Sequence, residues 1–253
     1  MTAQPTTQHA TLAGRTVVIT RPAGTAAALV RQVHARGGVP VLLPGLSLRA
    51  ADNPDAVREQ LAAALQDELL VFTSPAAVRY AHALMPLKTC ATVLAVGQGT
   101  ARALQRHGVT AQAPLQRQDS EGLLELAALQ ELRDRHVALI GAPGGRGVLR
   151  EELVARGAQL RELHVYRRTL PRLDRRHVDA VLQLSTDARV LLSSTEALQN
   201  LLEILPLPAR LRLCGSVAVV SSERLAEIVR TASFTQVRVA VSARSKDFLE
   251  AAV

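Results

Sequence analysis

The chain has 253 residues, which is enough for one large domain or two small ones with a substantial buried core. Apolar residues make up 48% of it, mainly as Ala, Leu and Val, whereas aromatic residues make up only 2%. This composition is typical of a folded α/β protein and excludes a disordered or fibrous chain. No apolar run reaches the roughly 18 residues of a membrane span, so no transmembrane helix is expected.

The formal net charge of +8 comes largely from arginine and suggests an anionic partner, such as nucleic acid, a membrane surface or an acidic metabolite. The arginines are, however, spread along the chain rather than gathered in runs. The aromatic residues that single-strand-binding proteins interleave with basic groups are missing. An arginine-rich genome that simply inflates the charge is the alternative.

The cysteines and the N-terminus indicate the compartment. Cys90 and Cys214 are too few for a disulfide framework and have no metal-ligand spacing, so reduced thiols and a cytoplasmic protein are expected. Residues 1–14 lack the basic start and apolar middle of a signal peptide and are interpreted as a short disordered tail. The histidines are scattered singly, so no metal site is expected.

Short apolar runs alternate with segments of helical spacing along the chain. The first strand is expected at 15–20, a helix that ends at a glycine at 26–38, and a strand that Pro44 stops at 39–44. Further strand–helix pairs follow at 69–74 with 76–84, 91–97 with 100–108, 136–141 with 149–157, and 188–194 with 195–205. Strands that alternate with helices indicate parallel sheets covered on both faces.

The two halves of the chain resemble each other. The segment from Thr16 aligns with that from His136 without a gap, at an offset of 136 − 16 = 120 residues. The same offset aligns "FTSPAAV" with "LSSTEAL", and "VGQGTARAL" pairs with "VSSERLAEI" after a small insertion. Three matches in the same order indicate two copies of one plan. We therefore expect an α/β fold with two doubly wound parallel-sheet domains built from pseudo-repeated halves.

Small hydroxyl and glycine residues stand where the strands turn into helices. In an open parallel sheet ligands bind beyond the carboxyl ends of the strands, and helix N-termini there favour anions. Ordinary N-capping is the alternative for any single segment. Because the segments recur in both halves, we expect an anion-binding site among them. The candidates are Thr73, Ser74, Gly97, Thr100, Ser120, Ser193, Ser194 and Ser222.

Two arginines stand at equivalent strand ends of the two halves. Arg21 follows the first strand, and Arg146 lies beside Gly145 in the glycine-rich turn "GAPGGRG". A guanidinium binds a carboxylate bidentately, so these are candidate contacts to an acidic ligand, with a plain surface role as the alternative. The turn has neither a P-loop nor a GxGxxG pattern. No Ser-His-Asp order, pair of carboxylates or nucleophilic cysteine pattern is visible, so an enzyme built on this chain would use few protein groups.

Five segments carry a resemblance to a known family. They are "VVITRPAG", "VFTSPAAV", "VLAVGQGTARAL", "DSEGLLELA" and "GGRGVLREELVARGAQLRELHVYRR". In this order they resemble uroporphyrinogen-III synthases, from residue 15 to about residue 250. The resemblance implies two α/β domains joined by a two-stranded antiparallel connector, near 42–48 and 163–169. One domain, 44–166, would be inserted into the other, which residues 1–43 and 167–253 would form.

The resemblance also implies a reaction. The family cyclises hydroxymethylbilane, a linear tetrapyrrole with eight carboxylates, to uroporphyrinogen III, with loss of water and inversion of ring D through a spirocyclic intermediate. The hydroxymethyl group leaves readily from an electron-rich pyrrole, so neither a metal nor an organic cofactor is expected. Uncatalysed closure gives the symmetric isomer, which makes positioning the central task. A monomer that receives its substrate from the preceding pathway enzyme is expected.

Tyr166 is the residue that the resemblance singles out. It corresponds to the family's cleft-facing tyrosine on a connector between the domains, where a phenol could donate a hydrogen bond to the departing hydroxyl. The alternative is a tyrosine that only packs at a hinge. Tyr80, within an expected helix, is assigned to packing. Ser74, Thr100, Ser194 and Ser222 are expected as donors to the substrate carboxylates.

Two other functions remain open from the sequence. A non-catalytic receptor for an acidic small molecule would use the same architecture, because a fold does not determine a function. A nucleic-acid-binding protein is suggested by charge alone, and its affinity would fall steeply with salt. We take neither nucleic acid nor a membrane to be the partner.

Overall fold

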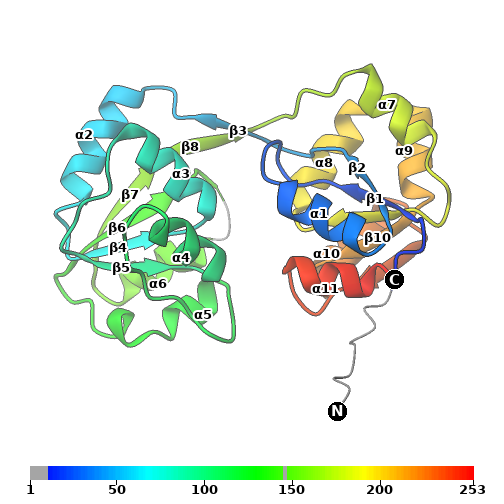
Figure 1. Cartoon of the computed structure of the whole chain (residues 1–253). Coiled ribbons are helices and arrows are strands. Elements are labelled where there is room, and N and C mark those ends of the chain that lie inside the picture. The colour runs from blue at the N-terminus through cyan, green and yellow to red at the C-terminus, as the bar shows by residue number, and fades with distance from the viewer. Residues whose placement is uncertain (1–10, 145–146) are drawn as a thin grey trace, which may run out of the picture. The chain divides into compact units, whose positions relative to one another are not determined.

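The computed structural model describes residues 11–144 and 147–253. The chain divides into two compact units (Figure 1). Unit 1 consists of Met1–Ser47 with Thr169–Val253, and unit 2 consists of Leu48–Arg168. The sequence placed the two boundaries slightly earlier, after residues 43 and 166.

Unit 1 is built on a five-stranded parallel sheet. Its strands are β1 (Thr16–Ile19), β2 (Val39–Leu42), β9 (Arg189–Leu192), β10 (Val217–Val220) and β11 (Gln236–Val239). They lie in the order β11-β10-β9-β1-β2, and every neighbouring pair is parallel. The central strands β9 and β10 are buried along their whole length, as expected for a parallel sheet covered on both faces.

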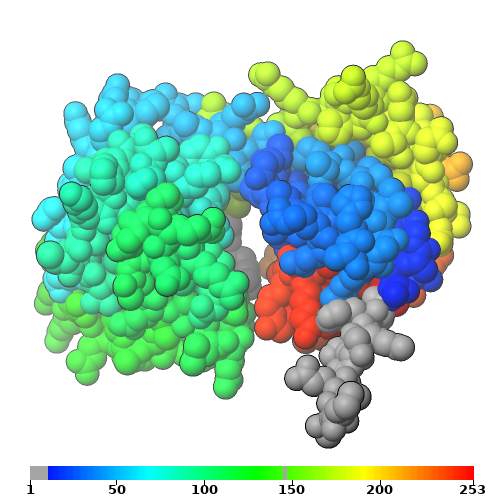
Figure 2. Space-filling model, viewed as in Figure 1, coloured from blue at the N-terminus to red at the C-terminus, as the bar shows by residue number. Residues whose placement is uncertain are grey.

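Helices cover both faces of this sheet. The helices are α1 (Ala27–Ala35), α7 (Arg175–Leu182), α8 (Thr195–Ile204), α9 (Leu207–Cys214), α10 (Glu223–Thr231) and α11 (Ser245–Ala251). Residues of α1 and α11 pack on one face and residues of the other four on the opposite face. Figure 2 shows the C-terminal residues, in red, beside the N-terminal segment, in blue. Two arginine side chains tie the chain end to this sheet, from Arg15 Nη1 to the Val253 carbonyl (3.0 Å) and from Arg189 Nε to the Ala252 carbonyl (2.7 Å).

Unit 2 is built on a four-stranded parallel sheet. Its strands, in the spatial order β5-β4-β6-β7, are β5 (Thr92–Ala95), β4 (Leu69–Phe72), β6 (His136–Gly141) and β7 (Gln159–His164). The helices α2 (Pro54–Ala64), α3 (Pro75–Leu84) and α4 (Gln98–Gln105) supply residues to the core on one face. The opposite face is covered by α5 (Ser120–Leu124), the 3₁₀-helix η1 (Ala127–Leu129) and α6 (Val148–Ala155).

Two strands outside these sheets join the units along the chain. They are β3 (Ser47–Ala50) and β8 (Tyr166–Thr169), which form a separate two-stranded antiparallel sheet. Both unit boundaries fall within these two strands. The predicted fold class, with two parallel-sheet domains and an antiparallel connector, is confirmed.

The internal repeat appears in the elements themselves. β4 and β9 begin 189 − 69 = 120 residues apart, and α3 and α8 begin 195 − 75 = 120 residues apart. Beyond α9 the offset grows, since β5 and β10 begin 217 − 92 = 125 residues apart. A short parallel bridge pairs Leu94 of β5 with Gln112. This bridge corresponds to the pairing of β10 with β11 in unit 1. Each sheet thus takes one strand pair, β1–β2 or β6–β7, from one copy and its remaining strands from the other.

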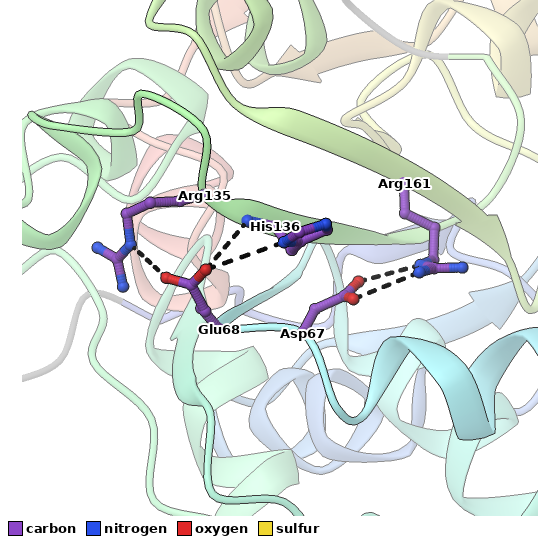
Figure 3. Close-up of polar contacts among 5 residues, drawn as sticks. All are labelled: Asp67, Glu68, Arg135, His136 and Arg161. Carbon is purple, nitrogen blue, oxygen red and sulfur yellow. Dashed lines mark hydrogen bonds and ion pairs between the residues drawn. The ribbon is translucent and has the colours of Figure 1, made fainter.

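Ion pairs fasten the amino edge of the unit 2 sheet (Figure 3). Asp67, at the end of the α2–β4 loop, is buried and accepts hydrogen bonds from Arg161 of β7, with Nε at 3.0 Å and Nη2 at 3.4 Å. Its neighbour Glu68 accepts from Arg135 Nε at 2.8 Å, ahead of β6. These contacts hold the α2–β4 loop to two other strands at the edge opposite the candidate site.

Candidate active site

A cavity of about 470 Å³ lies in unit 2 at the carboxyl edge of its sheet. Thr73 and Ser74, directly after β4, line it together with Gly141 at the end of β6. The helix that follows β4 packs on one face of the sheet, and the helix that follows β6 packs on the other. Two adjacent strands whose helices diverge in this way leave a crevice at their carboxyl ends, which is where doubly wound sheets bind ligands.

Tyr166 brings a phenol to this cavity. The residue is only 7% exposed, and its ring stacks on that of Tyr80, with centroids 5.4 Å apart and planes at 14°. The Tyr166 hydroxyl oxygen lies 3.2 Å from Ser74 Oγ, a hydrogen bond between residues 92 positions apart in the chain. Ser74 Oγ in turn accepts from the backbone N–H of Ala77 at 3.0 Å. The phenol is therefore packed on its ring and oriented at its hydroxyl.

Thr73 and Gly141 fit closely against each other. Thr73 Oγ1 donates to the Ile140 carbonyl at 3.2 Å, which joins the ends of β4 and β6. A Cβ at Gly141 would lie 2.5 Å from Thr73 Oγ1, so position 141 has no space for a side chain. The Thr73 hydroxyl hydrogen is committed to the backbone, and the oxygen offers only an acceptor to a ligand.

Several ionisable residues that line the cavity were not among the candidates from the sequence. Arg150 of α6, Glu162 and His164 of β7, and Arg168 of β8 line it. Glu162 and His164 are two positions apart on β7, so their side chains lie on the same face of the strand. This spacing at the end of a strand could have been recognised in the sequence. Arg168 Nη2 donates to the Pro143 carbonyl at 2.8 Å. Basic groups on three elements therefore converge on the crevice, which suits an acidic ligand.

The other unit 2 candidates occupy different environments. Ser120 lines the cavity, at the start of α5. Gly97 is the N-cap of α4, and the next backbone N–H, of Gln98, donates to Gln118 Oε1 at 3.1 Å. Thr100 is 4% exposed within α4. Gly145 and Arg146 lie outside the described residues.

The remaining candidates belong to unit 1, and they stand at its equivalent strand ends. Ser194 and Ser222 cap α8 and α10, where their hydroxyl oxygens accept from Ala197 N–H and Leu225 N–H, both at 3.3 Å. Ser193 precedes this cap and is exposed. Arg21 follows β1, and burial lowers the pKa of its guanidinium below the usual value. Among the described residues Arg21 has no acidic partner, which leaves its charge available to an anion.

Known proteins of one family are similar to this chain over most of its length. The model of the uroporphyrinogen-III synthase HemD family matches residues 27–250. The uroporphyrinogen-III synthase of Salmonella typhimurium is 30% identical over 250 residues, which cover 93% of this chain and 98% of that protein. The chain belongs to the uroporphyrinogen-III synthase family. The Escherichia coli synthase is 29% identical over 244 residues, with the same shares covered, 93% and 98%.

Solved structures of this family share the fold. The crystal structure of a mutant uroporphyrinogen III synthase from Thermus thermophilus superposes with a TM-score of 0.59 at 21% identity, covering 94% of this chain and 96% of that one. The synthase from Helicobacter pylori gives a TM-score of 0.59 at 14% identity, covering 94% and 97%. The family resemblance seen in the sequence is confirmed, and with it an enzyme of the cyclising lyase class.

Within residues 11–144 and 147–253, no helix is long and apolar enough to cross a bilayer. In the same part of the chain, no group of three or more His, Cys, Asp or Glu side chains is arranged to hold a metal ion. Cys90 and Cys214 are free thiols.

Proposed function

We propose that this chain cyclises hydroxymethylbilane to uroporphyrinogen III, and that the unit 2 cavity, lined by Ser74 and Tyr166, holds the reacting end of the substrate. Membership of the family supports the reaction. The formal charge of +8 supports a substrate with eight carboxylates. Inversion of ring D through a spirocyclic intermediate requires the folded substrate to be held while the new bonds form.

The observation that carries the proposal is the Tyr166 hydroxyl on the cavity lining, hydrogen-bonded to Ser74. As the C–O bond of the hydroxymethyl group breaks, its electron pair goes to oxygen and the phenol supplies the proton, so water departs. The pyrrole nitrogen supplies electron density to the carbon left behind. On final ring closure a pyrrole carbon loses its hydrogen as a proton, which restores the phenol. One water is lost overall, and no redox partner is required.

Basic groups would hold the acidic side chains of the substrate. Arg150, His164 and Arg168 face the unit 2 cavity. In unit 1 we assign Arg21, at the end of β1, to a substrate carboxylate. The sequence candidates Gly97, Thr100, Ser120, Gly145, Arg146, Ser193, Ser194 and Ser222 remain proposed substrate contacts. The inserted domain and the discontinuous domain that the family resemblance implies are also part of the proposal.

The setting of the reaction is also part of the proposal. We assign the enzyme to the cytoplasm as a monomer that takes hydroxymethylbilane from the preceding enzyme of heme biosynthesis. Neither a metal nor an organic cofactor is required, because the hydroxymethyl group on an electron-rich pyrrole leaves readily once it is protonated. Neither nucleic acid nor a membrane is a partner.

Analysis of the product isomers tests the function. Purified protein is supplied with hydroxymethylbilane in the presence of a chelator, the products are oxidised, and types I and III are separated. Mostly type III is expected, because the enzyme directs closure to the substituted carbon. Type I alone, at the uncatalysed rate, would contradict the enzyme and favour a receptor for acidic small molecules.

A further inference from the structure

Ser74 Oγ takes part in two hydrogen bonds. It is the N-cap of the ten-residue helix α3, with an extended backbone at φ −164° and ψ 160°. Its Oγ accepts from Ala77 N–H at 3.0 Å and lies 3.2 Å from the Tyr166 hydroxyl oxygen. Because the Ala77 N–H can only donate, Ser74 Oγ is an acceptor in the first bond and its own hydrogen is free for the second.

The direction of the second bond decides what Tyr166 can do. A phenol has a single hydrogen. If Tyr166 donated that hydrogen to Ser74, none would remain for the substrate. An oxygen that already accepts from a backbone N–H at the positive end of a helix is polarised and becomes a better donor. The helix cap therefore favours donation from Ser74 to Tyr166.

We propose that Ser74 is a positioning residue that donates to the Tyr166 hydroxyl oxygen and so leaves the phenol hydrogen for the departing hydroxyl of the substrate. The inference rests on the proposed function and deepens it. The Ala77 N–H, the Ser74 hydroxyl and the Tyr166 hydroxyl then form one chain of donors that ends at the substrate oxygen. As the phenol gives up its proton, the Ser74 bond becomes charge-assisted and stabilises the developing phenolate.

The aromatic stack fixes the other end of the phenol. Tyr80 lies against the Tyr166 ring, and its hydroxyl donates to the Leu48 carbonyl at 2.8 Å. Tyr166 is buried in the core that α3 forms with the sheet. With its ring held in this way, Tyr166 keeps its hydroxyl beside Ser74. The Ser74 hydroxyl therefore orients the proton of the phenol and does not bind a substrate carboxylate.

A double-mutant cycle tests this role. The variants are Ser74→Ala and Tyr166→Phe, alone and together, with kcat and KM for conversion of hydroxymethylbilane to the type III isomer. Ser74→Ala is expected to lower kcat about tenfold, the effect of one lost hydrogen bond to a charged group, with little change in KM. In the Tyr166→Phe background Ser74→Ala is expected to leave kcat unchanged, because the hydroxyl through which Ser74 acts is absent.

Further variants separate capping from proton donation. Ser74→Thr keeps both and is expected to retain kcat within about threefold. Ser74→Asp keeps the cap but has no hydrogen to donate, so its kcat should fall about as far as that of Tyr166→Phe. Asn53 is the capping control, since it caps α2 before Pro54 as Ser74 caps α3 before Pro75 and is not part of the cavity lining. Asn53→Ala should lower the melting temperature by a few degrees and leave kcat unchanged.

Two results would overturn the inference. The first is an equal loss of kcat from Ser74→Ala with and without the Tyr166 hydroxyl. The second is a raised KM with unchanged kcat, as expected of a residue that binds a substrate carboxylate. Failure of the proposed function would give a different result, because the unmodified protein would then produce only the type I isomer.

Discussion

Asp247 is a buried carboxylate on the last helix of unit 1. Its Oδ2 accepts hydrogen bonds from Ser242 Oγ and from Arg244 Nε, the latter at 3.0 Å, so it holds the loop before α11. The Ser242 hydrogen bond, followed by the bond and charge of Arg244, lowers the pKa of the Asp247 carboxyl below its usual value. The ionised form is therefore favoured in the folded protein.

This pKa shift predicts an acid-sensitive contribution to stability. Because the folded pKa is below the unfolded one, the contribution is present above the usual aspartate pKa of about 3.9 and disappears as the pH falls through the lowered value. Asp247→Asn should reduce the free energy of unfolding by about 1–2 kcal/mol at pH 7 and have little effect once the pH is below the lowered pKa of Asp247. Urea unfolding of both proteins at several pH values measures this. Glu250→Gln, on the same helix and in an exposed ion pair with Lys246, is the control with little expected effect. If Asp247→Asn lowered the free energy of unfolding by the same amount at every pH, ionisation of Asp247 would not be the source of the stabilisation.

Single residues also show which features of the site the sequence could predict and which it could not. The strand-end rule selected Thr73, Ser74 and Ser120, and the structure has all three on one cavity. The bond between Ser74 and Tyr166 was not predicted, because no local pattern reports a contact across 92 positions. Thr100, also chosen as a strand-end hydroxyl, is 4% exposed on α4, and such burial depends on packing that the local sequence does not report.

At the scale of elements, Gly45 determines how the chain leaves the unit 1 sheet. A Cβ at this position would stand 2.6 Å from the Ala197 carbonyl oxygen, in the first turn of α8. The Gly45 carbonyl also accepts from Asn200 Nδ2 at 2.9 Å. The segment after β2 therefore lies directly on α8, and any side chain at position 45 would separate them.

Two glycine substitutions are expected to have opposite effects on stability. Gly45→Ala should lower the free energy of unfolding by about 1–3 kcal/mol, because backbone must move to admit the methyl group. Gly99→Ala is the matched control, since its nearest neighbour is Pro75 Cγ at 3.7 Å and the position lies within α4. It should raise stability by about 0.5–1 kcal/mol, because alanine favours a helix more than glycine does. Thermal unfolding of both variants measures this, and equal effects would contradict the close contact at Gly45.

The elements themselves were largely predictable. The 120-residue offset in the sequence returns as the offset between β4 and β9 and between α3 and α8. Hydrophobic alternation and glycine or proline boundaries define each of these elements locally. The helices α2, α7 and α9 are among the elements that the sequence did not predict. α9 lies in the segment after α8 where the second copy is longer than the first.

At the scale of the whole molecule, the positive charge and the repeat have separate consequences. The repeat explains the two sheets, because a strand pair from one copy completes the sheet of the other. The charge of +8 does not specify a fold, and it supports an acidic substrate only together with the arginines that line the unit 2 cavity. Neither feature alone could have identified the reaction, which depended on the ordered motifs and the family match.

The most direct test of the account compares Tyr166→Phe with Tyr80→Phe. Each substitution removes one hydroxyl from the same aromatic pair and retains the stacked ring, but Tyr80 donates to the Leu48 backbone and Tyr166 lies on the cavity. Single-turnover conversion of hydroxymethylbilane, with separation of the type I and type III isomers, gives the rate and the outcome together. The account predicts a fall in rate of about 10- to 100-fold and a larger type I fraction for Tyr166→Phe, with Tyr80→Phe within about threefold of the unmodified protein. Equal rates for the two variants would contradict a proton donor at Tyr166.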